Sequence, residues 1–376
     1  RIDQAPERRR VSGANLLGRW SRDMGEGSRT QLQAYVDQTR RDQPGSILET
    51  LDTVDVEFQH LSQPWTTHEL LWGAGYRNQR DRVTNINTAA LAFMPADANM
   101  KLWNVFAQDE VQLPGGFRLT LGGKLEHNDY TGIEFLPNAR LSWEIAPNHL
   151  LWGAVSRAVR TPSRIDRELF SPGTPPYAVV AGGSNFNSEV ARVYEIGYRA
   201  QPLPALSYSI TLFHHDFDGL RSLDAQPGGP TFNNNFEGRL TGLEAWGSWR
   251  VSDSWRLGAS YVKQNQHFQA LPGTTPIGGT ASLGNDPRYY ATLGSSWNIG
   301  ANMEFDVQAR RVGALPNPAV PAYTALDLRW GWRVRPDVEL SVTVRNLGDP
   351  RHAEWGNPAG RVEVERSVFF KAVWRI

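Results

Sequence analysis

Apolar and polar residues alternate with a period of two along most of this chain. From 338 to 345, every even position is Val or Leu, while the odd positions carry Glu, Ser, Thr and Arg. The same alternation recurs near 119–126 and 326–335, and the i, i+3, i+4 spacing of an amphipathic helix is almost nowhere present. Successive side chains of a strand point to opposite faces. Each of these segments is therefore predicted to be a strand with one apolar and one charged face.

Reading the whole chain in this way predicts an all-β protein of about seventeen long strands. The strands are expected near 14–22, 29–41, 51–60, 67–82, 99–113, 117–129, 134–146, 148–159, 189–201, 205–217, 234–251, 255–268, 286–300, 302–312, 321–335, 338–347 and 361–376. Many exceed ten residues, whereas strands of soluble sheets usually have about five or six. A strand tilted by about 45° needs roughly 9 to 11 residues to cross a bilayer. The lengths therefore favour strands that cross a membrane.

The connections between the predicted strands alternate between short and long. Short, turn-forming connections rich in Pro, Gly, Asn, Asp and Ser are expected at 113–116, 146–148, 201–204, 252–254 and 335–337. Long connections are expected at about 83–98, 160–188, 218–233, 269–285 and 348–360, with two departures from the alternation near 130–133 and 313–320. Short turns on one side and long loops on the other are typical of an outer-membrane β-barrel.

The polarity of the two faces predicts how such a barrel is oriented. A dry core would accommodate the many charges of the polar faces only at a high energetic cost, whereas a wide, wet lumen accepts them. Apolar side chains are then expected to face lipid and charged ones to face the lumen. Tryptophans near strand ends would form the interfacial girdles: Trp249, Trp255, Trp297, Trp330, Trp332 and Trp374. This orientation can be tested on six residues. We expect lipid to be faced by Leu119, Leu328 and Leu340, and the lumen to be faced by Glu126, Arg329 and Arg345.

Composition narrows the function classes. The 39 basic and 39 acidic residues balance, which argues against a general nucleic-acid binder. The chain has no cysteine, which excludes disulfide scaffolds, thiolate metal sites and cysteine nucleophiles. The longest apolar run is Ala89–Met94, far short of the roughly 20 residues of a membrane-spanning helix. The adjacent His214 and His215 point to opposite faces of a strand, so a metal site there is not expected. No catalytic constellation or cofactor motif is found, so neither enzyme activity nor a cofactor is expected.

Five segments of the chain carry recognisable motifs: 106–110 (FAQDE) with 119–126 (LTLGGKLE), 156–163 (SRAVRTPS), 194–199 (YEIGYR), 344–349 (VRNLGD) and the closing segment 361–376. In their order and spacing, these segments resemble the TonB-dependent outer-membrane receptors over most of the chain. This family forms a plugged barrel of the 22-stranded class. The resemblance implies that residues 1–376 are one partial barrel domain of the bacterial outer membrane, and that an N-terminal plug and about five first strands lie upstream of Arg1.

The resemblance also implies a function and a set of partners. It implies an active transporter that takes up a scarce ligand, most simply a ferric siderophore or a similar metal chelate, driven by the TonB system. TonB would contact the plug, lipid would surround the wall, and the barrel assembly machinery would recognise the C-terminal strand. The cargo stays open, because haem, cobalamin, nickel-chelate and oligosaccharide receptors can share one scaffold.

Long loops are where a receptor is expected to recognise its cargo. The longest predicted loop, 160–188, carries arginines and aromatic residues that could pair with and stack on an anionic chelate, and a second candidate segment is 232–236. The charges at the start of the longest loop are equally consistent with a solvated loop base. The candidate ligand-binding residues are Arg160, Arg164, Arg167, Tyr177, Phe186, Phe232 and Phe236.

Two alternatives remain at this point. A passive porin of 16 to 18 strands would have the same alternation and an open, charge-tuned lumen. A soluble β-propeller would also be rich in Trp and Gly. Propellers repeat every 40 to 45 residues or so, and no such repeat is found here.

Overall fold

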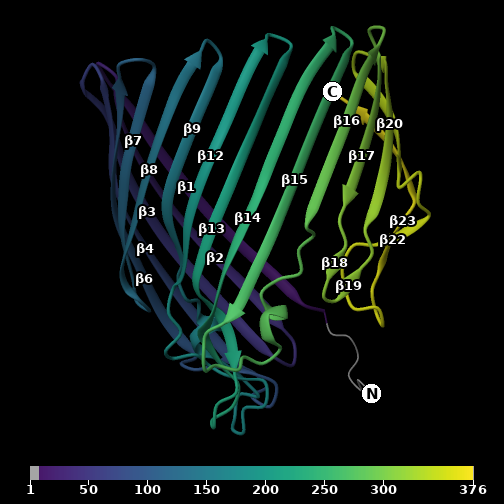
Figure 1. Ribbon diagram of the computed structural model, residues 1–376. Coiled ribbons are helices and arrows are strands. Elements are labelled where there is room, and N and C mark those ends of the chain that lie inside the picture. The colour runs from purple at the N-terminus through teal and green to yellow at the C-terminus, as the bar shows by residue number, and fades with distance from the viewer. Residues whose placement is uncertain (1–7, 376) are drawn as a thin grey trace.

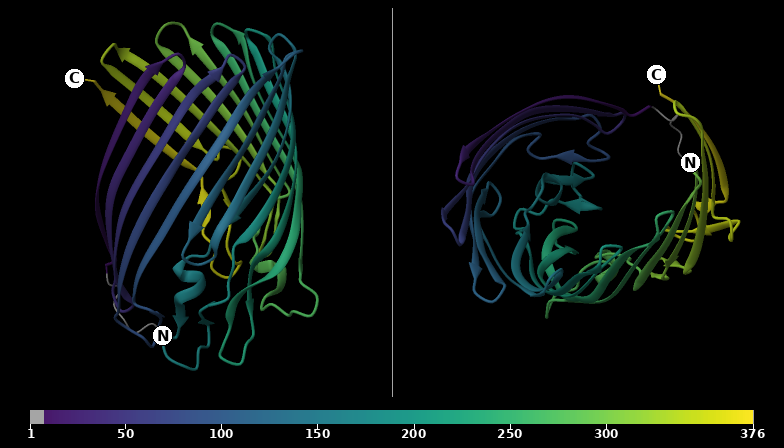
Figure 2. Two further views of the ribbon diagram at one scale, coloured as in Figure 1. Left: turned by 90° about the vertical axis from the view of Figure 1, so that its left-hand side faces the viewer. Right: turned by 90° about the horizontal axis from the view of Figure 1, so that it is seen from above.

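The chain forms one antiparallel sheet of 17 strands rolled into an incomplete cylinder, seen in a computed structural model that describes residues 8–375 (Figures 1 and 2). The wall strands are β1 Arg10–Gly25, β2 Ser28–Gln43, β3 Ile47–Trp65, β4 His68–Asn85, β6 Asp97–Leu113, β7 Phe117–Asn128, β8 Gly132–Ala146, β9 His149–Arg160, β12 Glu189–Leu203, β13 Leu206–Asp224, β14 Thr231–Ser252, β15 Trp255–Ala270, β16 Tyr289–Ile299, β17 Met303–Val312, β20 Tyr323–Arg335, β21 Val338–Arg345 and β24 Ser367–Trp374. Each predicted strand overlaps one of these, so the predicted all-β fold is confirmed. The last residue of the predicted closing segment, Ile376, lies outside the described residues.

Every wall strand is paired with its neighbours along the chain. Within residues 8–375, β1 pairs only with β2 and β24 only with β21. The ring seen end-on in Figure 2 is therefore open between these two strands. Both faces of β1 are exposed along its whole length, as expected for an edge strand. In the described part of the chain, no helix is long and apolar enough to cross a membrane.

The connections separate the cylinder into two different ends. One end, at the top of Figure 1, carries only short turns such as 114–116, 204–205 and 336–337. The other end carries the long loops 86–96, 161–188, 271–288 and 346–366, together with shorter links. The predicted alternation is present, except that the long connection predicted at 218–233 is reduced to 225–230, because β13 and β14 extend into it. The connection at 313–322 lies at the long-loop end and follows it, while the turn at 129–131 departs from it as expected.

Short strands and two short helices lie in the connections of the long-loop end. They are β5 Ala92–Phe93, α1 Arg164–Glu168, β10 Leu169–Ser171, β11 Val180–Ala181, the 3₁₀ helix η1 Gly279–Ser282, β18 Leu315–Pro316, β19 Ala319–Val320, β22 Arg351–Ala353 and β23 Glu363–Glu365. Only β23 falls within a predicted strand, the closing segment 361–376, which the structure divides into β23 and β24. The others were not predicted, because two- to five-residue elements carry too few positions for a period to be recognised.

Apolar side chains form a continuous band on one face of the wall. The register places Ile196 opposite Leu212, and Leu212 opposite Leu243, and comparable apolar rows run from strand to strand. Near the short-turn end, the rings of Trp255, Trp297 and Phe305 stack along one row, with centroids 5.8 Å apart in each pair. Aromatic rows of this kind are typical of membrane interfaces.

The opposite face of the wall is charged and faces the lumen. On this face Arg329 bonds Glu304, Asp306 and Glu339 across three strands, at 3.0, 3.0 and 3.2 Å. Figure 2 shows α1 inside the ring, and Arg164 of α1 contacts Asp81 of β4. The face that carries Asp81 is therefore the lumen face.

The six residues chosen as a test of the faces follow this division. By register, Leu119 lies opposite Leu141 and Leu328 opposite Val344 in the apolar band, and the exposed Leu340 lies opposite Trp332. The strand positions of Glu126, Arg329 and Arg345 place them on the lumen face. The predicted orientation of the wall is confirmed.

Candidate functional site

Two long loops fold inward and meet at the mouth of the lumen. The loop at 161–188 contributes α1, β10 and β11, and β10 pairs with both β11 and β5 of the loop at 86–96. We call this small three-stranded sheet with α1 the inner loop module. It lies inside the ring in the end-on view of Figure 2. The module narrows the lumen at its long-loop end.

The start of α1 is fixed by a capping box. Ser163 is the N-cap, its side chain accepts from the backbone N–H of Asp166, and the Asp166 carboxylate accepts from the backbone N–H of Ser163. Pro162 precedes the cap and disfavours the helical conformation for Thr161, so the helix does not extend back toward β9. The five-residue helix begins directly after β9, so its charged side chains meet the wall rather than solvent.

Arg164 ties the inner loop module to the wall. Its side chain is only 6% exposed and donates to Asp81 of β4 at 2.8 Å and to Glu168 at 2.6 Å. It also donates to the backbone oxygens of Pro95 and Ala96, and its guanidinium lies 5.0 Å from the ring centre of Phe93. A fully buried guanidinium with this many partners is a fixed anchor rather than a free contact for a ligand.

Asp166 is the centre of a second charged cluster. It is fully buried and accepts from Arg160 at 2.9 Å, from Arg221 at 3.0 Å and from Ser163. Burial by itself would raise the pKa of Asp166, but the hydrogen bonds from Arg160, Ser163 and Arg221 outweigh burial and hold that pKa below its usual value. Solvated loop charge, one reading of the sequence, is therefore wrong for this cluster. The charges are paired because the loop at 161–188 brings Asp166 between Arg160 of β9 and Arg221 of β13.

The inner loop module is expected to loosen in acid. A carboxyl whose pKa is lower in the folded state stabilises that state above its unfolded pKa of about 3.9, and this contribution is lost as pH falls through the folded value. Hydrogen-exchange protection of the α1 amides should be constant from neutral pH to about 5 and should decline below about 4. Asp166→Asn should weaken the hydrogen-exchange protection of these amides at neutral pH and should make the protection less dependent on pH. A variant that keeps the parent's pH profile would contradict this assignment.

Tyr130 supports the cluster from the turn between β7 and β8. Its hydroxyl donates to Glu168 at 2.9 Å. Burial and the neighbouring Glu168 carboxylate raise the pKa of Tyr130 well above its usual value, so the hydroxyl stays protonated. Arg167 lies over the Tyr130 ring at 5.3 Å and donates to the backbone oxygen of Phe186 at 2.7 Å. These contacts hold α1 against the turn between β7 and β8.

A cavity of about 450 Å³ opens beside this cluster on the lumen side. Its charged walls are Arg160, Arg221 and Glu189. The two arginine side chains are each 45% exposed, whereas that of Glu189 is 13% exposed. Each guanidinium has five N–H donors and gives only one or two of them to Asp166 and Glu189, so several donors remain. The cavity is lined by Arg160, Glu189, Phe217, Leu220, Arg221, Phe268, Ser282 and Leu283. Two guanidinium groups beside aromatic rings can bind an anion with planar, apolar parts.

The seven residues predicted from the sequence are distributed over this region in different roles. Only Arg160 lines the cavity. Arg164, Phe186 and Phe236 are buried, and Arg167 is engaged by backbone and Tyr130. Tyr177 packs on Phe170 with ring centres 5.0 Å apart, and Phe232 lies beneath Arg221 at 5.1 Å.

Sequence reasoning missed Phe217, Arg221 and Phe268 of the cavity. A signal was present for the two aromatics: Phe217 and Phe268 fall on the lumen-side face of strands predicted from alternation, near the ends that enter the predicted long loops. Large apolar residues at lumen positions beside a loop are unusual in such a pattern. Arg221 gave no signal of its own, because strand β13 continues past the predicted end and carries this residue toward Asp166.

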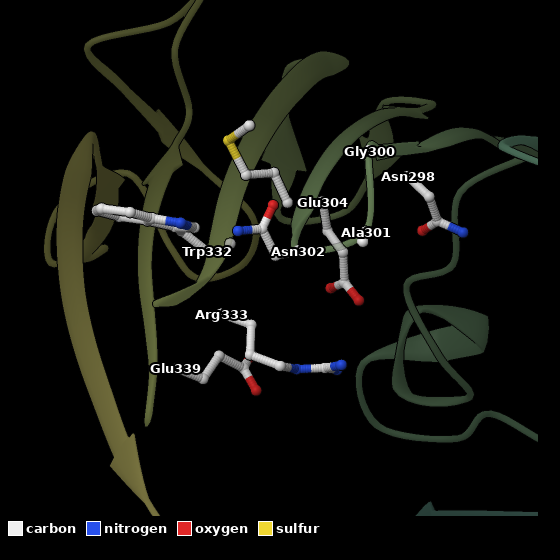
Figure 3. A pocket seen from close by; sticks show the side chains of 10 residues that line it. Asn298, Gly300, Ala301, Asn302, Glu304, Trp332, Arg333 and Glu339 are labelled. Atoms are coloured by element: carbon white, nitrogen blue, oxygen red, sulfur yellow. The ribbon is translucent and has the colours of Figure 1, made fainter. Parts of the chain in front are cut away.

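A second lumen cavity lies at the short-turn end and is smaller, about 240 Å³. Figure 3 shows Asn302, Glu304 and Arg333 around it, and Glu339 also contributes. Gly331 leaves room for the cavity, because a Cβ there would lie 2.9 Å from the Arg329 guanidinium. Ligand sites usually have 300 to 1,000 Å³ or so. The cavity at the mouth is therefore the better candidate for binding a chelate.

No group of three or more His, Cys, Asp and Glu side chains within residues 8–375 is placed to hold a metal ion. His214 hydrogen bonds Thr241 at 2.8 Å and Asp216 at 3.0 Å.

Comparison with known proteins gives a consistent result. The sequence model of the family described as "TonB dependent receptor-like, beta-barrel" matches residues 9–347. An iron-regulated outer membrane virulence protein of Vibrio cholerae is 27% identical over 290 residues, which cover 68% of this chain and 42% of the relative. The chain thus spans less than half the length of this curated relative.

Solved structures show the same wall. The FrpB iron transporter from Neisseria meningitidis (F3-3 variant) superposes with a TM-score of 0.80 at 14% identity, over 97% of this chain and 63% of that one. A mutant of the ferric enterobactin receptor from Pseudomonas aeruginosa, in complex with enterobactin, superposes with a TM-score of 0.79 at 14% identity, over 97% and 62% of the two chains. At these identities the likeness establishes the fold.

Proposed function

This chain belongs to the TonB-dependent receptors, outer-membrane β-barrel transporters that are not enzymes, and from that premise we propose that it takes up a scarce anionic metal chelate, foremost a ferric siderophore. The chelate would enter from the long-loop end, which faces the cell exterior, and bind at the mouth of the lumen. Release inward would be driven by the TonB system, which the family implies.

The observation that supports this proposal is the cavity at the mouth. Arg160 and Arg221 present free N–H donors, and Phe217 and Phe268 present ring surface to the same space. Charge-assisted hydrogen bonds select an anion, while the rings favour a ligand with flat apolar parts. The cavity opens to the lumen, so a ligand bound there lies on the path through the barrel. One structural relative is a ferric enterobactin receptor bound to enterobactin.

We further propose that residues 1–376 are one barrel domain of a longer receptor, preceded by the remaining strands and a plug. The open edges at β1 and β24 and the 62–63% coverage of the two solved receptors support this arrangement. The plug would carry the contact with TonB, and the C-terminal strand β24 would be read by the barrel assembly machinery.

Replacing Arg160 or Arg221 with glutamine should weaken binding of a ferric siderophore by the full-length receptor. A hydrogen bond to a charged group contributes about 1.5 to 3 kcal/mol, so each change should raise Kd by roughly 10- to 100-fold. Titration of purified receptor with a panel of ferric chelates would measure this. Arg118→Gln, on the lumen face far from the mouth, is the matched control and should leave Kd unchanged. Equal Kd for the parent and both cavity variants would contradict the site.

Energy dependence distinguishes active uptake from passage through a porin. Uptake of radiolabelled ferric chelate should cease in cells that lack the TonB protein, whereas diffusion through an open lumen would continue. Deleting 165–185, which removes most of the inner loop module, should abolish uptake and leave a folded barrel. Uptake that persists in both experiments would favour the porin.

A further inference from the structure

Two phenylalanines of the cavity at the mouth come from strands that are not neighbours. Phe217 lies on β13 and Phe268 on β15, and β14 runs between these strands. Adjacent strands are about 4.7 to 4.9 Å apart, so the side chain of the middle strand usually separates residues of the two outer strands. Here the two ring centres are only 6.2 Å apart, and the ring planes are inclined at 47°. The rings therefore meet across β14.

The residue between the two rings is Gly238. By register, Gly238 of β14 lies opposite Phe217 on one side and opposite Phe268 on the other. A Cβ on Gly238 would overlap the Phe268 ring and would lie 2.6 Å from the backbone oxygen of His267. Any residue other than glycine would therefore displace the Phe268 ring or the backbone of β15. We call Phe217 and Phe268 the ring pair.

The same arrangement is repeated further along β14. Gly242 lies opposite Phe213 of β13, and a Cβ on Gly242 would overlap the Phe213 ring. On the same face of β13, the ring centre of His215 lies 5.2 Å from that of Phe213 and 6.0 Å from that of Phe217. A strip of rings thus continues from the cavity into the lumen, beside two glycines of β14.

The ring pair can distinguish between kinds of apolar ligand surface. Leu220 and Leu283 also line the cavity, and aliphatic side chains of this kind accept any apolar group. Aromatic rings in addition attract other rings, in edge-to-face and offset arrangements that an aliphatic group cannot form. Because the two rings are inclined to each other, a third ring can contact the face of one and the edge of the other.

We propose that Gly238 is a specificity-determining residue of the cavity, because it lets Phe217 and Phe268 form one aromatic wall that selects ferric chelates with aryl rings. This inference rests on the proposed function, since it concerns the ligand of the same cavity. An aryl ring of the chelate would pack on the ring pair, while anionic oxygens of the chelate would accept from the free N–H donors of Arg160 and Arg221. Gly238 would act through the position of the two rings.

Binding of two probes by the purified full-length receptor tests this proposal. The probes are ferric enterobactin, which carries catechol rings, and the ferric complex of desferrioxamine B, a hydroxamate without rings. The parent should bind the catecholate more tightly. Gly238→Ala and Phe268→Leu should each raise Kd for the catecholate about two- to tenfold, the value of one aromatic contact, and change Kd for the hydroxamate by less than about twofold. Neither substitution alters a charge, so the ratio of the two Kd values reports on ring contacts.

Gly258→Ala is the matched control. Gly258 lies on the same face of β15 as Phe268, near the short-turn end, and a Cβ there would be 3.9 Å from its nearest neighbour, the backbone oxygen of Gly247. This variant should bind both probes like the parent. Heat-modifiable migration on gels would show which variants are folded, and Phe268→Leu tests the ring pair even if Gly238→Ala does not fold.

Three results would overturn the proposal. They are equal changes in the two Kd values, no change in either value, and a parent that does not prefer the catecholate. The transport proposal fails on other evidence, namely unchanged chelate binding in Arg160→Gln and Arg221→Gln or uptake that persists without TonB. A receptor with TonB-dependent uptake of the ferric hydroxamate and no preference for the catecholate would retain the transport proposal and overturn only the role of Gly238.

Discussion

Replacing Ile210 with arginine should destabilise the barrel in lipid by about 2 to 4 kcal/mol. Ile210 is exposed on the outer face of β13, where its ladder partners are Tyr198 and Ala245. Neither partner carries a negative charge to neutralise the guanidinium, and no water reaches the hydrocarbon to solvate it. Urea unfolding in lipid vesicles would measure the loss directly.

The neighbouring Thr211 provides the matched control. It lies on the lumen face, opposite Glu244 of β14, so Thr211→Arg gains water and an acidic neighbour. The expected change in unfolding free energy is within about 0.5 kcal/mol. Equal destabilisation by the two arginines would show that the wall does not divide into a lipid face and a wet face.

Replacing Arg164 with leucine should detach the inner loop module from the wall. The change leaves Asp81 buried without its cation, and one oxygen of this carboxylate already has no hydrogen-bond partner. Breaking a buried ion pair on one side destabilises by about 3 to 5 kcal/mol. Because the module is local, the expected result is faster hydrogen exchange of the amides in β10 and β11 with a barrel that stays folded.

Two further variants test whether the unpaired Asp81 carboxylate causes the loss of hydrogen-exchange protection. The double variant Arg164→Leu with Asp81→Leu should regain much of the lost protection, since apolar residues can replace a buried pair at little net loss. Arg351→Gln removes an exposed pair with Glu363 and should change stability by less than about 1 kcal/mol. Protection that is unchanged in Arg164→Leu would show that Arg164 is not the anchor.

The prediction of the site was partial for a physical reason. Arg160 was identified because charge and aromatic residues cluster in its loop, and it does line the cavity at the mouth. Arg164 and Phe186 share that sequence signature, yet they are buried structural contacts. Composition reports which residue types a loop contains. It does not report which of them another loop covers, and here the loop at 86–96 covers Arg164.

The amino-acid sequence by itself determined the wall. A period of two fixes which side chains share a face, and strand length with alternating turns fixes the number and direction of the strands, because both are local properties of the backbone. Only the tertiary structure decided what the long loops do. The loop at 161–188 folds inward because Arg164 pairs with Asp81, which lies 83 residues earlier in the sequence. In addition, Asp166 of this loop accepts hydrogen bonds from Arg160 and Arg221, which lie on two different strands. Contacts between residues so far apart in sequence depend on how the wall curves, and no local pattern records them.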